Sequence, residues 1–416
     1  FDDWDCLAAG IVAGHILECG AQSTGGNFTD WQKVESLDEI GFPICEMSSK
    51  GSFVITKHDK TGGLVSVDTV REQLFYEMAD PTNYITPDVI ADFSKISLAS
   101  LGTNRVRVTG VSGRPPTAFY KVSMAFEEGF KVTGSILVSG PNARQKAQKF
   151  AEIYWKRVNA DFTEKRTEFL GLNACHGDLG HQNEAAEIVL RLAMRGSNKE
   201  VLRQNARLIP SLILSGPPGV AVLGGVPKVQ SIVRYWPALI AKNVDPVISL
   251  FSESEQIKTT HTIKSLPLEK EVSPPQQSVQ VASRASLSLE DVCQHQHLSE
   301  AVYLEKLCLA RSGDKGDMVN IGVIARNQEC YEYLKEILTA QFIKNLYQQM
   351  CLGQVTRYEI DSLMGLNFLL DSSLGGGGSC TLKVDSQGKT FAQALLRQRV
   401  LIPEKRLASL RKKKAL

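Results

Sequence analysis

A long polar segment interrupts this chain of 416 residues and most constrains how it can fold. Across residues 253–298 the apolar periodicity is lost, and three prolines stand among Ser, Gln, Thr and Lys. Such a segment cannot bury enough apolar surface to offset the entropy lost on ordering, so we expect a disordered linker. The sequence therefore predicts two folded blocks, 1–252 and 299–405, with a basic tail at 406–416.

Composition excludes several classes of protein. The 47 basic and 45 acidic side chains leave a formal net charge of +2, so no global basic field exists for nucleic acid. No stretch approaches the roughly 20 apolar residues that cross a membrane, so we expect no membrane partner. The nine cysteines are irregularly spaced. This usage predicts reduced thiols in an intracellular compartment, cytoplasmic or mitochondrial.

The first block mixes two periodicities. Apolar residues at three- and four-residue spacing predict helices over 141–160, with Ser139 as a plausible N-cap, and over 182–195. Alternation and β-branched residues predict strands over 105–109 and 130–138. Because helices and strands interleave, we predict an α/β fold, a mixed α/β core domain.

The second block predicts a small α+β domain of ferredoxin-like type, with about four strands and two helices. The expected strands are 302–309, 319–325, 355–360 and 366–370. The expected helices are 329–350 and 390–397.

A glycine-bearing loop follows the apolar run 11–17. Backbone N–H groups beside small residues can approach an anion or oxyanion. We expect this loop to line a ligand, through Gly20, Gln22, Thr24, Gly25, Gly26 and Asn27. Cys19 is a candidate nucleophile if its pKa is depressed. The alternative is a buried cysteine beside a structural turn.

Glu46 follows another glycine-containing turn, Gly41-Phe42-Pro43. A buried glutamate near a glycine loop can act as a general base. A satisfied structural carboxylate is the competing interpretation.

The string CHGDLGHQ at 175–182 is the densest cluster of ligand-type side chains. His176, Asp178 and His181 could bind a transition metal, but the spacing is not a standard zinc pattern and no second pair completes a site. We favour no metal here, and treat His176 and Asp178 as candidate catalytic or binding groups. A loop that caps the next helix is the structural alternative.

The string RSGDKGD at 311–317 is predicted as a loop between two strands of the second block. Arginine and lysine beside a glycine turn suit a carboxylate or phosphate. The candidate binding residues are Arg311, Ser312, Gly313, Asp314 and Lys315. Alternatively, Asp314 and Asp317 pair with the cations and hold the loop.

Several nucleotide and hydrolase motifs are absent. Gly388-Lys389-Thr390 resembles the end of a P-loop, but the required preceding glycine is replaced by Lys383. The chain has no Gly-x-Gly-x-x-Gly fingerprint and no Gly-x-Ser-x-Gly elbow. No particular cofactor is indicated.

Six strings together resemble a known family. AGHILECGAQSTGGN (13–27), CHGDLGHQ (175–182) and SGPPG (215–219) resemble the AtuA family, named for acyclic terpene utilisation. RSGDKGD (311–317), NIGV (320–323) and LGGGGS (374–379) resemble its companion C-terminal domain, described as ferredoxin-like. The resemblance also implies a longer segment upstream of residue 13, so the chain looks like an N-terminally truncated member.

The resemblance implies a role in the breakdown of citronellol and geraniol, near enzymes that handle branched acyl-CoA esters. Our hypothesis is an intracellular enzyme, or enzyme component, of branched-chain or isoprenoid acyl metabolism. Its expected partner is an acyl-CoA or another anionic small molecule, held by Arg311 and Lys315 across the domain interface. The alternatives are a non-catalytic assembly subunit and an inactive truncated paralogue. The sequence is also compatible with a homo-oligomer.

Overall fold

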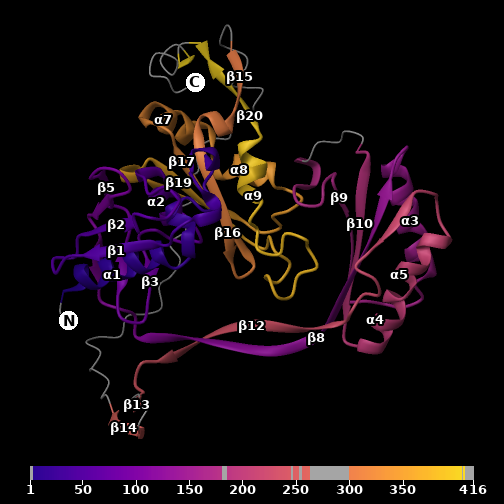
Figure 1. Cartoon of the computed structure of the whole chain (residues 1–416), viewed down its shortest axis with the longest axis horizontal. Coiled ribbons are helices and arrows are strands. Elements are labelled where there is room, and N and C mark those ends of the chain that lie inside the picture. The colour runs from indigo at the N-terminus through magenta and orange to yellow at the C-terminus, as the bar shows by residue number, and fades with distance from the viewer. Residues whose placement is uncertain are drawn as a thin grey trace.

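The structure is a computed structural model that describes residues 3–179, 185–244, 247–252, 255–262, 299–404 and 406–407. Three clusters of buried apolar side chains divide this part of the chain. We call the corresponding bodies the N-terminal lobe (3–118), the distal lobe (129–229) and the C-terminal domain (299–407). Figure 1 shows the N-terminal lobe beside the C-terminal domain, with the distal lobe reached by a long two-stranded ribbon.

The N-terminal lobe is built around helix α1, Trp4–Leu17, which contains the apolar run 11–17. Asp3 caps the helix by accepting a bond from the Cys6 N–H at 3.0 Å. A second helix, α2, spans Val67–Leu74 and begins with a capping box at Ser66. One sheet has the order β1-β2-β6-β5 and a smaller one the order β3-β4-β7. Their bounds are Pro43–Met47, Phe53–Lys57, Val106–Thr109 and Ser97–Ser100, then Tyr84–Ile85, Ile90–Asp92 and Ser112–Arg114.

The distal lobe is an antiparallel sheet with the order β11-β8-β10-β9, packed against helices. The strands are β8 Phe119–Ser139, β9 Glu164–Leu170, β10 Glu187–Gly196 and β11 Val220–Leu223. The helices are α3 Ala143–Arg157, α4 Lys199–Ala206 and α5 Leu208–Ser211. Of the two helices predicted here, the first is α3, although Ser139 ends β8 and the residue before α3 is Asn142 at φ +60°.

The second predicted helix, 182–195, is wrong where the structure describes it. Residues 187–195 belong to the central strand β10, which pairs with both β8 and β9. Ile188, Leu190 and Leu192 are buried at alternate positions, which is the period of a strand. The helical spacing was misleading because Ala193, next to Leu192, is also buried in this central strand.

The ribbon consists of residues 119–127 of β8 paired with residues 233–241 of β12, Gln230–Ala241. Strand β13, Val247–Ser252, follows and pairs with β14, Glu255–Thr262. The predicted linker therefore begins too early, because 255–262 forms a strand. Residues 263–298 lie outside the described residues.

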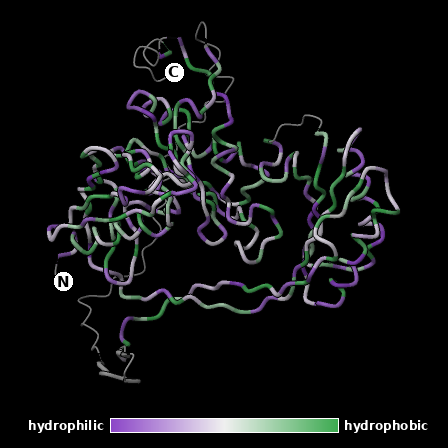
Figure 2. Tube along the Cα trace, in the orientation of Figure 1, coloured by the Kyte–Doolittle hydropathy of each residue, from purple (hydrophilic) through white to green (hydrophobic). Residues whose placement is uncertain are grey.

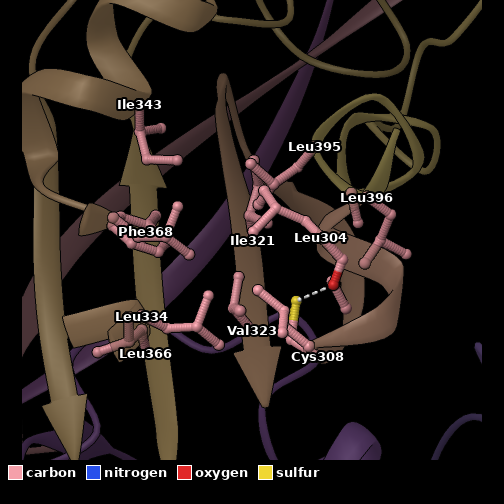
Figure 3. Close-up of a cluster of buried hydrophobic side chains, with 14 of the residues drawn as sticks. Leu304, Cys308, Ile321, Val323, Leu334, Ile343, Leu366, Phe368, Leu395 and Leu396 are labelled. Atoms are coloured by element: carbon pink, nitrogen blue, oxygen red, sulfur yellow. Dashed lines mark hydrogen bonds between the residues drawn. The ribbon is translucent and has the colours of Figure 1, made fainter. Parts of the chain in front are cut away.

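The C-terminal domain has an antiparallel sheet with the order β16-β17-β19-β18. Its strands are β16 Cys308–Lys315, β17 Met318–Ala325, β18 Val355–Ile360 and β19 Gly365–Leu370. The helices are α7 Gln328–Ile337, α8 Ala340–Leu346 and α9 Phe391–Leu396, and β15 Ser299–Tyr303 pairs with β20 Arg399–Pro403. Figure 3 shows Ile321, Val323 and Phe368 in the core between sheet and helices.

Two predicted elements of this domain are each divided in the structure. The strand predicted at 302–309 is broken by a 3-10 turn, Leu304–Lys306, between β15 and β16. The helix predicted at 329–350 is two helices, because Thr339 starts α8 by accepting the Phe342 N–H at 3.0 Å. The predicted loop 311–317 is mostly strand, since β16 continues to Lys315 and only Gly316 and Asp317 form the turn.

The second face of this sheet packs against the N-terminal lobe. On β17 and β19, glycine and asparagine alternate with core residues at Asn320, Gly322 and Asn367. A Cβ at Gly322 would stand 2.5 Å from the Phe75 Cβ, so only glycine allows the end of α2 to approach. Asn320 donates to the Phe75 carbonyl at 3.2 Å.

Among the described helices, none combines the length and apolar character needed to cross a membrane.

Candidate functional site

Charged side chains meet where the N-terminal lobe contacts the end of β16. Glu18 and Cys19 follow α1, Glu77 follows α2, Lys315 ends β16, and Lys389 precedes α9. We call these five residues the interlobe site. They act on one another electrostatically: burial raises the pKa of Glu18, Glu77 and Cys19, and the positive charges of Lys315, on the two glutamates, and of Lys389, on Cys19, oppose it.

Glu77 and Lys389 form the fixed part of this site. The Lys389 Nζ lies 2.6 Å from the Glu77 Oε1 and also contacts the Tyr76 hydroxyl. Burial alone would lower the pKa of Lys389, but the bonds to Glu77 and Tyr76 raise it. Glu77 has φ +51°, a conformation that costs energy in a non-glycine residue.

Gly313 makes room for Glu77. A Cβ at this position would stand 2.7 Å from the Glu77 Cγ and 3.0 Å from the Tyr76 ring. Its neighbour Asp314 lies 3.5 Å from the Lys389 Nζ. On the other side, Ser312 accepts the N–H of Ala392 at 3.0 Å. These three predicted residues thus position the interlobe site.

Lys315 differs from Lys389 because no described residue pairs with its ammonium group. Its side chain is half-buried. Within the described part of the chain, no hydrogen bond or ion pair engages its ammonium group, although its charge acts on Glu18 and Glu77. A half-buried cation without a partner is suited to an anionic group of a ligand.

Glu18 is the more accessible carboxylate, with 49% of its side chain exposed. Burial raises its pKa and the negative charge of Glu77 raises it further, while Lys315 opposes both. The result is a carboxyl group with a raised pKa beside a lysine. That combination suits a group that takes up and releases a proton.

His15 is a site residue that sequence reasoning missed. Its Nε2 lies 3.0 Å from the Gln73 carbonyl, so Nε2 carries the hydrogen and Nδ1 is free to accept. Nδ1 lies 3.6 Å from the Glu18 Oε1 and 3.5 Å from the Tyr84 hydroxyl. Burial lowers the pKa of His15 to about 4, so the ring is neutral. The only signal in the sequence was its place within the string 13–27.

Cys19 is half-buried beside these groups. Burial raises the pKa of its thiol, and the charge of Glu18 raises it further. A nucleophilic cysteine needs a depressed pKa. The described surroundings therefore keep Cys19 a neutral thiol that lines the site. The eight described cysteines are all free.

Arg311 joins the glycine loop to the C-terminal domain. It pairs with Glu72 at 3.1 Å, donates to the Gly26 carbonyl at 3.0 Å and also donates to Gln22. Burial raises the pKa of Glu72 to about 7, against the opposing charge of Arg311. Arg311 thus lies at the contact between the two lobes, where it binds the glycine loop. Its Nη1 and Nη2 donors are occupied by the chain itself, which makes it a structural clamp.

The rest of the glycine loop is held in place locally. Gly20 and Gly25 have φ +58° and +103°. Thr24 is buried and donates to the Gly41 carbonyl at 2.5 Å. Gly25 and Asn27 line a cleft of about 880 Å³ between this lobe and the C-terminal domain. Trp31, Lys306, Arg326 and Arg397 also line this cleft.

The loop at 175–179, which belongs to the distal lobe, contacts the segment that carries Lys389. The His176 Nε2 lies 3.1 Å from the carbonyl oxygen of Thr390, the neighbour of Lys389. Burial lowers the pKa of His176. Asp178 accepts a bond from Gln349, and both predicted residues line a small cavity of about 180 Å³. His181 lies outside the described residues.

Two glycine-containing turns enclose carboxylates of the chain itself. Asp317 accepts the N–H groups of Leu374 and Gly376 at 3.1 and 2.8 Å. Asp385 accepts those of Lys389 and Thr390, both at 2.9 Å. These amides are therefore not free to bind phosphate, in agreement with the exclusion of a P-loop.

Glu46 stands apart from the interlobe site. It lies on β1, half its side chain is exposed, and it pairs with Arg105 at 2.9 Å. That hydrogen bond lowers the pKa of Glu46. The expectation of a buried glutamate is wrong.

Among the residues that the structure describes, no group of three His, Cys, Asp or Glu side chains is arranged to hold a metal ion.

The comparisons with known proteins match two parts of the chain. The C-terminal domain matches a family model described as the AtuA ferredoxin-like domain, over residues 302–401. Residues 1–248 match the model described as acyclic terpene utilisation family protein AtuA. The chain therefore belongs to the AtuA family, which confirms the resemblance and the mixed α/β fold with a ferredoxin-like domain. No curated protein and no solved structure matches it.

Proposed function

We propose that this protein is an enzyme, or an enzyme component, of branched-chain or isoprenoid acyl metabolism that binds an anionic acyl compound at the interlobe site. The observation that carries this proposal is the half-buried Lys315, whose ammonium has no partner among the described residues. An acyl carboxylate, or the carbonyl oxygen of an acyl thioester, is the kind of group that such a cation binds.

The chemistry that this arrangement supports is proton transfer at the carbon next to the acyl carbonyl. Glu18 takes the proton, and the electron pair of the C–H bond moves onto the carbonyl oxygen. Lys315 stabilises the negative charge that develops on that oxygen. The raised pKa of Glu18 suits it to give the proton back.

Other residues position these two. The Nδ1 atom of His15 faces the Glu18 carboxylate. The Glu77–Lys389 ion pair packs against Gly313. His176 orients the segment that carries Lys389 through Thr390. Cys19 lines the site as a neutral thiol. In this proposal His176 and Asp178 are orienting groups in the interface between the lobes.

The test compares Lys315→Met with a matched control, Lys149→Met, at an exposed lysine on α3. Thermal unfolding is measured with a branched acyl-CoA ester, with the free branched acid and with coenzyme A alone. We expect the acyl-CoA to raise the melting temperature of wild type and control by several degrees, because a ligand that binds only the folded state stabilises it. Lys315→Met should lose this shift.

The chemical step is tested in D2O by following deuterium uptake at the carbon next to the acyl carbonyl. Glu18→Gln should slow this exchange by about 10² or more while the thermal shift survives. A shift that persists in Lys315→Met, or exchange that is equal in Glu18→Gln and wild type, would contradict the assignment.

A non-catalytic assembly subunit is the second candidate function, and one observation favours it. The ribbon exposes large apolar side chains on one face, including Met124 and Trp236, which are 42% and 55% exposed. Contiguous apolar surface of this kind marks contact with another protein. The absence of any ligand-induced shift, together with a stable complex in size-exclusion chromatography, would support this candidate.

A further inference from the structure

The two strands of the ribbon place apolar side chains on one common face. In the antiparallel register Met124 stands opposite Trp236, and Tyr120 opposite Ile240. Because cross-strand partners share a face and alternate residues return to it, the even-numbered positions of both strands lie together. We call this set the ribbon apolar face: Tyr120, Val122, Met124, Phe126, Trp236, Ala238 and Ile240.

The one charged residue among the even-numbered positions of the paired stretch is Arg234, opposite Phe126 at one end. The charged neighbours Lys121 and Glu127 lie on the opposite face of β8. Arg234 pairs with Glu128, so its charge is neutralised within the chain. The face therefore has the composition of a sheet surface that packs against a core.

The ribbon apolar face is nevertheless open. Met124, Phe126 and Ile240 are 42%, 43% and 43% exposed, and Trp236 is 55% exposed. Figure 1 shows the ribbon as two strands that extend between the lobes, and Figure 2 shows apolar segments recurring along it. An isolated pair of strands is marginally stable in water, so an apolar face of this length needs a cover.

We propose that a second copy of this chain covers the ribbon apolar face, in a two-fold symmetric dimer of ribbons packed face to face. A neutral apolar patch is complementary to itself, as an isologous contact requires. Its exposed area is on the order of 500 Å² per copy, so a pair reaches the roughly 1,000 Å² that a specific interface needs.

Packing through the face is favoured over pairing through the edge. Pro237 lies in the middle of β12, opposite Ser123. Proline has no N–H, and within a sheet its position is restricted to the side of an edge strand that faces solvent. A further strand therefore cannot pair continuously along the outer edge of β12, whereas the apolar face has no such block.

The test uses two adjacent positions of β8 that point to opposite faces. Met124→Glu places a charge on the ribbon apolar face, and Ser123→Glu places the same charge on the other face. Both side chains are exposed, so neither substitution buries a charge. The full chain is examined by sedimentation velocity from about 1 to about 50 µM.

We expect wild type and Ser123→Glu to dimerise and Met124→Glu to remain a monomer throughout this range. Circular dichroism and the melting temperature of diluted samples check that all three chains fold alike. A monomeric wild type, which would leave the face to a different protein partner, overturns the proposal. A Met124→Glu dimer, or equal dissociation in both variants, also overturns it. The outcome is independent of ligand binding at the interlobe site.

Discussion

The sheet of the C-terminal domain and the ribbon are both antiparallel, but only the sheet is covered on both sides. Phe368 and Ile321 are fully buried under helices, and Asn320 and Gly322 are buried under the N-terminal lobe. On the ribbon, Phe126 and Trp236 stand open. The same strand alternation thus has different energetic consequences, because stability depends on what each face contacts.

The largest expected effect tests this difference with one side chain in two places. Phe368→Ala should lower the free energy of unfolding by about 4 kcal/mol, because it leaves a cavity in a closed core. Phe126→Ala should change it by about 0.5 kcal/mol or less in dilute monomer. Urea unfolding measures both. Equal losses would mean that the ribbon is as well packed as the sheet.

The pH dependence of stability tests the buried groups at the covered interface. Burial lowers the pKa of His15 to about 4 from its usual 6.5, so its stabilising contribution is present above pH 6.5 and is lost as the pH falls toward 4. Glu72 has the opposite sign: its pKa is raised to about 7 from 4.5, so stability declines as the pH rises between those values. Each effect is at most about 3 kcal/mol.

Between pH 4.5 and 6.5 these two contributions oppose each other. Glu72→Gln should therefore make the free energy of unfolding rise more steeply as the pH rises. His15→Gln should make the free energy of unfolding fall as the pH rises. Urea midpoints measured at intervals of half a pH unit separate the two slopes. Parallel profiles for wild type and both variants would show that neither group has a pKa shifted by burial.

A smaller effect tests the close approach of the N-terminal lobe to the sheet. Gly322→Ala should cost about 2 kcal/mol, because the new Cβ would stand 2.5 Å from the Phe75 Cβ. Gly10→Ala is the matched control: it lies in α1 with open space around it and should be neutral or stabilising. A neutral Gly322→Ala would show that the two bodies can separate without loss.

Elements that carry their own local signal were predicted well. Helix α3, strands β17, β18 and β19, and helix α9 lie close to their predicted positions, because periodicity and turn residues are properties of neighbouring residues. The misassigned β10 is instructive. Its apolar residues satisfy both periods, and its place between β8 and β9 selects the strand.

The candidate site was predicted only in part. The glycine loop and Arg311 were both predicted to bind a ligand, but they contact each other in a clamp that holds the lobes together. His15, Glu77 and Lys389 were missed because nothing local distinguishes a buried histidine or an ordinary ion pair from functional groups. Glu77 and Lys389 are 312 residues apart, and their contact exists only because the end of α2 docks on the sheet.

The sequence by itself determined the family and the mixed α/β class, because each depends on local strings and composition. Only the tertiary structure decided which charges remain available. Arg311 and Lys315 lie four residues apart on β16, yet Arg311 is buried against Glu72 while Lys315 reaches the end of the strand without a described partner. That difference arises from distant segments packing around one strand, and desolvation of a charge depends on every neighbour that packs against it.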